Sequence, residues 1–186
     1  MLDNSRWRKS ESYVEKWSDR SRFMLSVFDE AVDDAAKLNF TEYGCGPNAP
    51  FSKAVAPSGR PVARYDLRAW DEGCKVVDLN EAGFQAEATD CGVLSGVVEY
   101  LNDFGATLEV LAPLHRYILF SYFLCEPRPW EVLPSQRVTA IRKRIVRNGW
   151  RNHMRLDDVL GCVARVGFLR DLRTYERQTI FLVERF

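Results

Sequence analysis

The residues of this sequence with the clearest potential to bind a ligand form a glycine turn. Gly44-Cys45-Gly46 end a short run of alternating apolar residues that reaches Glu42. Glycines in such a turn let the backbone approach a ligand closely, and the small and polar residues behind it could open a helix with free N–H groups. Because a single G-x-G also occurs in many ordinary turns, its meaning depends on the residues downstream of it.

Three later positions fit a nucleotide-binding arrangement. Asp66 lies twenty residues after Gly46, at the expected end of the next strand, where a carboxylate can accept hydrogen bonds from both hydroxyls of a ribose. Asp78-Leu79 follow a third strand, where a carboxylate and a backbone N–H could read an adenine edge. Ser95-Gly96 follow a fourth strand, beside the point at which such sheets bind ligands.

The elements that must position these residues are those of an α/β protein. Apolar runs predict strands at 40–43, 61–65, 75–77, 90–94, 116–120, 168–175 and 178–184. Helical periodicity covers 11–37, 97–114, 136–147 and 156–165. We expect Gly167 to cap the last helix, and the stretch from Asp66 to Lys75 to be a loop because it is too short for a full helix. The alternation predicts a doubly wound α/β fold: a mostly parallel seven-stranded sheet, helices on both faces and an antiparallel C-terminal hairpin.

The composition limits the class of protein. Of the 186 residues, 46% are apolar and 28% charged, and the formal net charge is zero, so neither nucleic acid nor a membrane is required as a partner. No apolar run reaches the roughly eighteen residues of a membrane span, and the N-terminus is too polar for a signal peptide. The five cysteines are scattered without a C-x-x-C pair and there are two histidines. These counts favour a cytoplasmic protein with reduced thiols over a disulfide frame or a metal site.

The ordered set of motifs resembles the class I S-adenosylmethionine-dependent methyltransferases. The matching segments are E-Y-G-C-G-P (42–47), Y-D-L (65–67), V-V-D-L-N-E (76–81), T-D-C-G-V-L-S-G-V-V-E-Y-L (89–101) and G-F…Q-T-I-F-L-V (167–183). The resemblance implies one domain, 1–186, with an N-terminal helical cap over 1–37 and a Rossmann-like core over 38–184. The family has a full helix between its second and third strands that this chain lacks, so the adenine side should be more open.

The resemblance also implies S-adenosyl-L-methionine as the cofactor. Glu42 and the backbone of Gly44, Cys45 and Gly46 would hold its methionine end. Asp66 would bind the ribose, and Asp78 and Leu79 the adenine. Ser95 and Gly96 would line the floor near the sulfonium.

Catalytic residues are harder to assign, since the methyl group of the cofactor is already activated and the protein mainly positions the reactants. Candidates near the mouth of the site are Glu99, Tyr100, Ser121, Tyr122, Trp150, Asn152 and His153. We expect His153, which can titrate near neutral pH, and Tyr100 to take part in catalysis. The alternatives are that Glu99 and Tyr100 start a packed helix and that His153 is structural.

The sequence does not identify the acceptor of the methyl group, because a basic segment has more than one interpretation. Residues 137–155 contain Arg137, Arg142, Lys143, Arg144, Arg147, Arg151 and Arg155 and no acidic residue. This segment could be a solvated helix face, a site for an acidic acceptor or a nucleic-acid face, the last disfavoured by zero net charge. We expect methylation of an O or N atom of a small molecule or glycan, under a lid made by the N-terminal helix and residues 150–153. A nucleic-acid methyltransferase and a non-catalytic scaffold are the alternatives, and the oligomeric state is not predicted.

Overall fold

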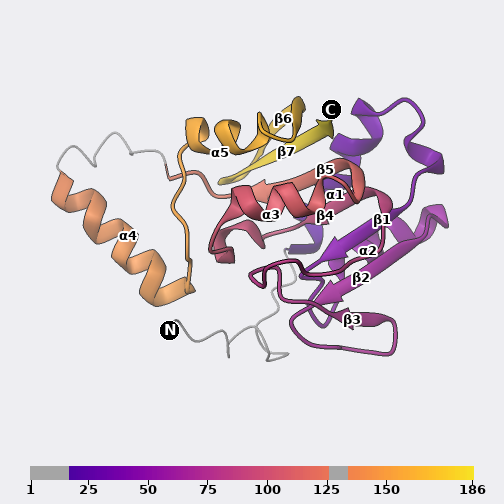
Figure 1. The fold of residues 1–186 in the computed structure, drawn as a ribbon, viewed down its shortest axis with the longest axis horizontal. Coiled ribbons are helices and arrows are strands. Elements are labelled where there is room, and N and C mark those ends of the chain that lie inside the picture. The colour runs from indigo at the N-terminus through magenta and orange to yellow at the C-terminus, as the bar shows by residue number, and fades with distance from the viewer. Residues whose placement is uncertain (1–16, 126–133) are drawn as a thin grey trace.

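Seven strands form one sheet in a computed structural model that describes residues 17–125 and 134–186 (Figure 1). The strands are β1 (Phe40–Tyr43), β2 (Val62–Asp66), β3 (Cys74–Val76), β4 (Thr89–Leu94), β5 (His115–Tyr122), β6 (Gly167–Tyr175) and β7 (Gln178–Arg185). Their order is β3-β2-β1-β4-β5-β7-β6, and β7 runs antiparallel to both of its neighbours while the other pairs are parallel. The predicted fold class is confirmed.

The register of the central strands brings their carboxyl ends together. Tyr43, the last residue of β1, pairs with Tyr65 of β2 on one side and with Leu94 of β4 on the other. All four residues of β1 are buried, as expected for a strand covered on both faces. The segments that leave β1, β2 and β4 therefore meet at one edge, where the strand order reverses.

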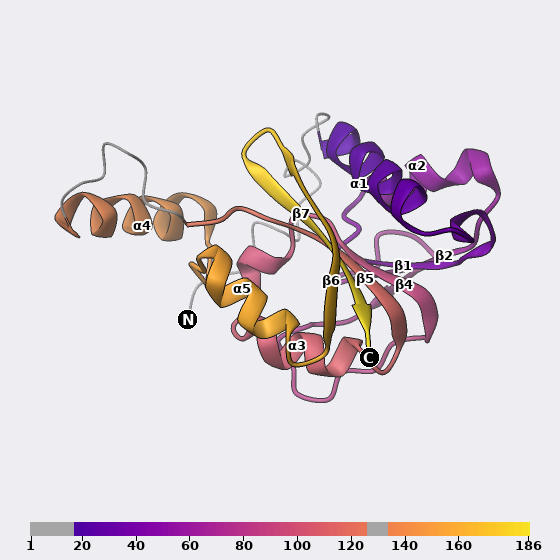
Figure 2. The ribbon, with the colours of Figure 1, turned by 90° about the horizontal axis from the view of Figure 1, so that it is seen from above.

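Helices cover both faces of the sheet (Figure 2). The helices α1 (Trp17–Ala31) and α2 (Pro50–Val55) lie on one face, and α3 (Phe104–Leu111) and α5 (Leu156–Val163) lie on the other. The helix α4 (Pro134–Asn148) stands apart from the sheet, and no residue from Ser135 to Asn148 is buried.

Each face has its own hydrophobic core. Phe28 of α1 packs on Phe40 with ring centroids 5.2 Å apart, in the cluster shared with α2. On the other face Phe104 of α3 packs on Phe120 at 4.9 Å, and Phe181 stacks on Phe120 at 4.8 Å. Each such buried ring contributes about 1.5–3 kcal/mol relative to an exposed one.

Two details of the sequence prediction are wrong. The segment predicted as one helix, 97–114, is a short 3₁₀ turn, η5 (Val98–Tyr100), followed by α3, because the Asp103 side chain accepts the Ala106 N–H at 3.0 Å and starts a new helix. Gly167 does not cap α5, which ends at Val163, but begins β6. A Cβ there would lie 2.2 Å from the Glu184 carbonyl oxygen, so glycine permits the close approach to β7.

The other predicted elements are present with small shifts. The first helix ends at Ala31, earlier than predicted, and the part of that prediction over 11–16 lies outside the described residues. Residues 67–73 form the predicted loop without a helix. None of the helices in the described part of the chain combines the length and apolar character needed to cross a bilayer.

Candidate functional site

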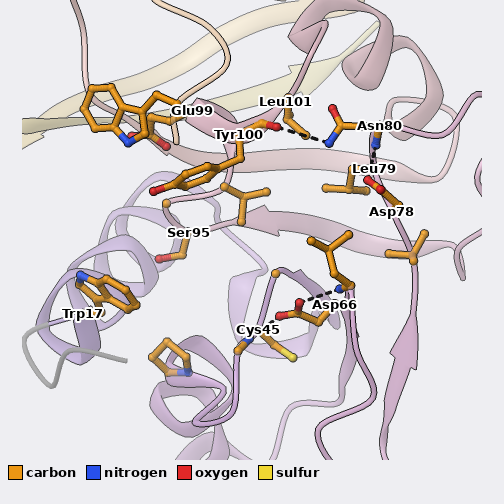
Figure 3. A pocket seen from close by; sticks show the side chains of 18 of the residues that line it. Trp17, Cys45, Asp66, Asp78, Leu79, Asn80, Ser95, Glu99, Tyr100 and Leu101 are labelled. Atoms are coloured by element: carbon orange, nitrogen blue, oxygen red, sulfur yellow. Dashed lines mark hydrogen bonds between the residues drawn. The ribbon is translucent and has the colours of Figure 1, made fainter. Parts of the chain in front are cut away.

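A pocket of about 330 Å³ opens at the carboxyl edge of the sheet (Figure 3). Its wall combines the turn after β1, the ends of β2 and β4, the loop after β3, the start of α1 and the start of β7. Nine of the predicted site residues line it: Gly44, Cys45, Gly46, Asp66, Asp78, Leu79, Ser95, Gly96 and Tyr100. Two predicted residues, Glu42 and His153, are not part of the lining.

The glycine turn is fastened to β2. The N–H of Gly44 donates to the Tyr65 carbonyl oxygen at 2.7 Å, and the N–H of Gly46 donates to Oδ2 of Asp66 at 2.7 Å. Gly44 has a φ of +66°, and a Cβ on it would lie 2.4 Å from a methyl carbon of Val97. The turn therefore requires glycine at this position, both for its backbone angle and for the space.

Asp66 links the end of β2 to this turn. Besides the bond from Gly46, its Oδ1 accepts the N–H of Leu67 at 2.6 Å. A carboxylate offers about four lone-pair sites, so two backbone bonds leave room for further donors from the pocket. Burial raises the pKa of Asp66, and the backbone bonds offset that effect only in part.

The carboxylate of Glu42 binds the start of α2 and does not line the pocket. Its two carboxylate oxygens accept the N–H groups of Phe51 at 3.0 Å and Ser52 at 2.9 Å, and the Ser52 hydroxyl also donates to it. The first turn of α2 thus gives these N–H groups to Glu42 rather than to a ligand, so the expected free N–H groups behind the glycine turn are not found at these two residues. Burial raises the pKa of Glu42, which is only 1% exposed.

The segment after β3 closes another side of the pocket. The Asp78 side chain accepts the Asn80 N–H at 2.9 Å. The Asn80 side chain donates to the Tyr100 carbonyl oxygen at 3.3 Å and accepts the Asn102 N–H at 2.6 Å. Asn80, which the sequence analysis did not single out, therefore joins the loop after β3 to the loop after β4.

The start of α1 forms the side of the pocket opposite the segment after β3. It does so through Arg20, a residue that the sequence analysis missed. Arg20 donates to the Ser95 hydroxyl at 3.1 Å, to the Ser95 carbonyl oxygen at 3.2 Å and to the Gln178 side-chain oxygen at 2.8 Å. The signal for Arg20 was its position: it is a charged residue on the apolar stripe, four residues before the buried Met24. Gln178 had no comparable signal.

Glu99 lies in the same wall. Figure 3 shows Glu99 and Tyr100 on the side of the pocket opposite Asp66 and Cys45. Oε1 of Glu99 accepts the N–H of Phe123 at 3.0 Å. Burial raises the pKa of Glu99, and the backbone N–H of Glu99 itself and then the positive charge of Arg20 oppose that shift.

His153 lies beside the pocket rather than in it. Its ring centroid is 6.3 Å from that of Trp150, which does line the pocket. Burial and the charge of Arg144 both lower the pKa of His153, so its imidazole is neutral at neutral pH. Within the described residues, no group of three or more His, Cys, Asp or Glu side chains gathers to hold a metal ion.

Neither a family model nor a curated protein sequence matches this chain. Solved structures do match its fold. An O-methyltransferase family protein from Burkholderia thailandensis aligns with a TM-score of 0.65 and 14% identity, over 95% of this chain and 59% of that one. This chain also spans only 54% of a mitomycin 7-O-methyltransferase, with a TM-score of 0.63 and 13% identity over 92% of this chain.

Two further matches hold S-adenosylhomocysteine. A magnesium protoporphyrin IX methyltransferase from Synechocystis PCC 6803 aligns with a TM-score of 0.56 and 16% identity, over 98% of this chain and 94% of that one. A 1,6-didemethyltoxoflavin-N1-methyltransferase from Burkholderia thailandensis aligns with a TM-score of 0.63 and 13% identity, over 92% of this chain and 81% of that one. The fold is therefore that of the class I methyltransferases, as the motif resemblance predicted.

Proposed function

We propose that this protein is an S-adenosyl-L-methionine-dependent methyltransferase that modifies an O or N atom of a small organic molecule. The observation that carries the proposal is the position of Asp66. Its carboxylate ends β2, holds the glycine turn through Gly46 and lines the pocket. This is the arrangement that a ribose with two adjacent hydroxyls needs.

The residues of the pocket fit this cofactor. Asp66 would bind the ribose, Asp78 and Leu79 the adenine, and the backbone of 44–46 with Ser95 the methionine end. When bound, the cofactor supplies an activated methyl group on its sulfonium. The chain then has to position the acceptor and exclude water, which requires no strongly nucleophilic side chain.

The acceptor side of the pocket is lined by aromatic residues. Trp17, Tyr100 and Trp150 contribute to its wall, and rings of this kind suit a flat organic acceptor. None of the seven cationic residues of 137–155 is among the described lining. Arg144 instead lies over the ring of Phe123, at 5.0 Å from its centroid. Arg20 is the only cation among the described lining residues, and it donates to Ser95 and Gln178. The lining thus supports a neutral organic acceptor better than an acidic one.

The first test is a calorimetric titration of S-adenosylmethionine and S-adenosylhomocysteine into the wild type and Asp66→Ala. We expect micromolar affinity for the wild type and a loss of at least about tenfold, or 1.4 kcal/mol, for the variant. Asp71→Ala is the matched control, because Asp71 pairs with Arg64 outside the pocket. If the folded wild type binds neither compound, the enzyme proposal fails and a scaffold role is favoured.

An alternative acceptor can be tested separately. The exposed face of α4 carries Arg142, Lys143 and Arg147, which leaves nucleic acid as a second candidate. Such binding would weaken steeply as salt rises. A gel-shift titration with RNA and DNA between low and physiological salt would detect it, and no shift at low salt would exclude it.

A further inference from the structure

The two fully buried glutamates of the described chain are satisfied to different degrees. Glu42 receives three hydrogen bonds from α2 and lies outside the pocket lining. Glu99 is 2% exposed, and among the described residues no donor reaches its Oε2. Buried polar atoms are almost always hydrogen-bonded, so an orphaned carboxylate oxygen in a pocket wall requires an explanation.

The Glu99 carboxylate cannot easily turn toward solvent. Its Oε1 is held by the N–H of Phe123 at 3.0 Å, and its backbone oxygen accepts the N–H of Arg151 at 2.8 Å. Both the backbone and one carboxylate oxygen are thus fixed. Oε2 therefore stays in the wall and can be satisfied only by a donor that arrives there.

Arg20 acts on Glu99 through its charge rather than through contact. Arg20 directs its donors to Ser95 and to the Gln178 side-chain oxygen. Gln178 in turn presents its amide NH₂ to Oε1 of Glu99 at 3.5 Å. Among the described residues no ion pair within 4.0 Å involves Glu99, so the charge of Arg20 favours the carboxylate from a distance.

The surroundings define the ligand that would satisfy Oε2. The partner must be a hydrogen-bond donor, and an anionic acceptor would be repelled by Glu99. Trp17, Tyr100 and Trp150 line the same pocket, and aromatic walls favour a flat ring. A neutral aromatic molecule with an O–H or N–H group meets all three conditions.

We infer that Glu99 is the acceptor-binding carboxylate, and that its Oε2 accepts the hydrogen bond of a hydroxyl or amine on a neutral aromatic acceptor. Gln178 and Arg20 are positioning residues that hold it. The inference names the acceptor class for the methyltransferase proposed above and therefore rests on that function.

The experiment compares donors with their methylated counterparts. One- and two-ring phenols and anilines, each paired with its methyl ether or N,N-dimethylamine, are titrated calorimetrically into wild type with and without S-adenosylhomocysteine. We expect at least one phenol or aniline to bind at least tenfold more tightly than its methylated partner. Equal binding within every pair, no binding by any compound or a preference for aromatic carboxylates would overturn the inference.

The variant Glu99→Gln changes one atom. Because the Phe123 N–H requires an oxygen at the Oε1 position, the glutamine must place its NH₂ where Oε2 lies, so a donor then meets a donor. We expect the preference to disappear or to reverse in favour of the ether. Glu109→Gln is the control, because Glu109 pairs with Arg165 at the surface, outside the pocket lining, and this variant should keep the wild-type preference.

The readouts separate this inference from the proposed function. S-adenosylhomocysteine affinity should change by less than about threefold in Glu99→Gln, because the ribose side is untouched. Loss of cofactor binding in wild type would overturn the methyltransferase proposal, while the donor preference measured without cofactor still tests Glu99. An unchanged preference in Glu99→Gln would overturn the inference on Glu99.

Discussion

The two sides of the pocket, the Asp66 side and the Glu99 side, are built from contacts of very different sequence separation. Asp66 is bonded to Gly46, 20 residues away, and to its neighbour Leu67. On the Glu99 side, Arg20 reaches Gln178 over 158 residues, and Gln178 reaches Glu99 over 79. The first side follows from the register of adjacent parallel strands, whereas the second exists only when α1, η5 and β7 have come together.

Because of this difference, substitutions on the two sides should have different effects on folding and on cofactor affinity. Changes on the Asp66 side disturb a backbone turn that the sheet itself defines, so they should affect folding and cofactor affinity together. Changes on the Glu99 side remove side chains that tie distant elements together, so cofactor affinity should be affected less.

The largest effect is expected for Gly44→Ala. The positive φ costs about 1–2 kcal/mol for a residue with a Cβ, and the overlap with Val97 costs about 1–3 kcal/mol more. Urea denaturation should show a loss of about 3 kcal/mol or more, with loss of S-adenosylhomocysteine binding. Gly59→Ala is the control, because Gly59 has a φ of +71° with nothing within 4 Å of a Cβ. Equal losses in the two variants would contradict this account of the turn.

Acid should weaken the sheet beneath the Asp66 side through His115. Its Nδ1 donates to the Thr89 carbonyl oxygen at 3.2 Å, and its Nε2 accepts from the Tyr43 hydroxyl at 2.8 Å, which ties β5 to β4 and β1. Burial lowers the pKa of His115 from 6.5 to about 4. The stability that this neutral ring contributes is complete above pH 6.5 and is lost as the pH falls through about 4.

The size of this loss follows from the shift. A change of 6.5 to about 4 corresponds to about 3 kcal/mol of unfolding free energy. Urea denaturation from pH 7 to 4 should show this loss of unfolding free energy in wild type, and the loss should be absent in His115→Gln. If the free energy of unfolding depends on pH equally in both proteins, His115 does not cause the loss of stability in acid.

A smaller loss is expected for Arg20→Ala on the Glu99 side. Hydrogen bonds to charged groups contribute about 1.5–3 kcal/mol, so the free energy of unfolding should fall by about 2 kcal/mol. S-adenosylhomocysteine affinity should fall by less than about tenfold, in contrast to Asp66→Ala. Arg22→Ala is the control, since the pair of Arg22 with Asp19 is exposed and should change stability by less than about 1 kcal/mol.

The smallest effect is expected for Glu99→Gln, as a change in how the free energy of unfolding depends on pH. Burial raises the pKa of Glu99 in the folded protein. The stability that Glu99 contributes is therefore complete below its pKa in the unfolded chain, and it is lost as the pH rises through its pKa in the folded protein. The variant lacks this loss, so its stability relative to wild type should rise between pH 4 and pH 8. Melting temperatures across that range measure the difference, and a constant difference would contradict a buried ionisable Glu99.

The sequence allowed most of the Asp66 side to be predicted. Strand alternation, the spacing from Gly46 to Asp66 and the strand ends at Asp78 and Ser95 all follow from local patterns that a parallel sheet aligns. The register of β1 with β2 and β4 then brings these positions to one edge.

The predicted residues that lie outside the pocket lining, and the lining residues that were missed, depend on side-chain direction or on distant contacts. The pattern around Glu42 did not indicate whether the carboxylate faces the cavity or the N-terminus of α2. His153 was chosen for its chemistry, but Trp150 beside it lines the pocket. Arg20 and Gln178 were missed because their hydrogen bond joins α1 to β7, two elements that are far apart in the sequence.

The insertion of β7 between β5 and β6 has a consequence for biosynthesis. The ribosome makes β5 by Tyr122 and β7 only from Gln178, so at about 5–20 residues per second the edge of β5 waits for several seconds without its partner. During that time an unpaired strand edge is open to other chains. Arg20 meets Gln178 only after this interval, so the Glu99 side of the pocket cannot be completed before β7 has been made.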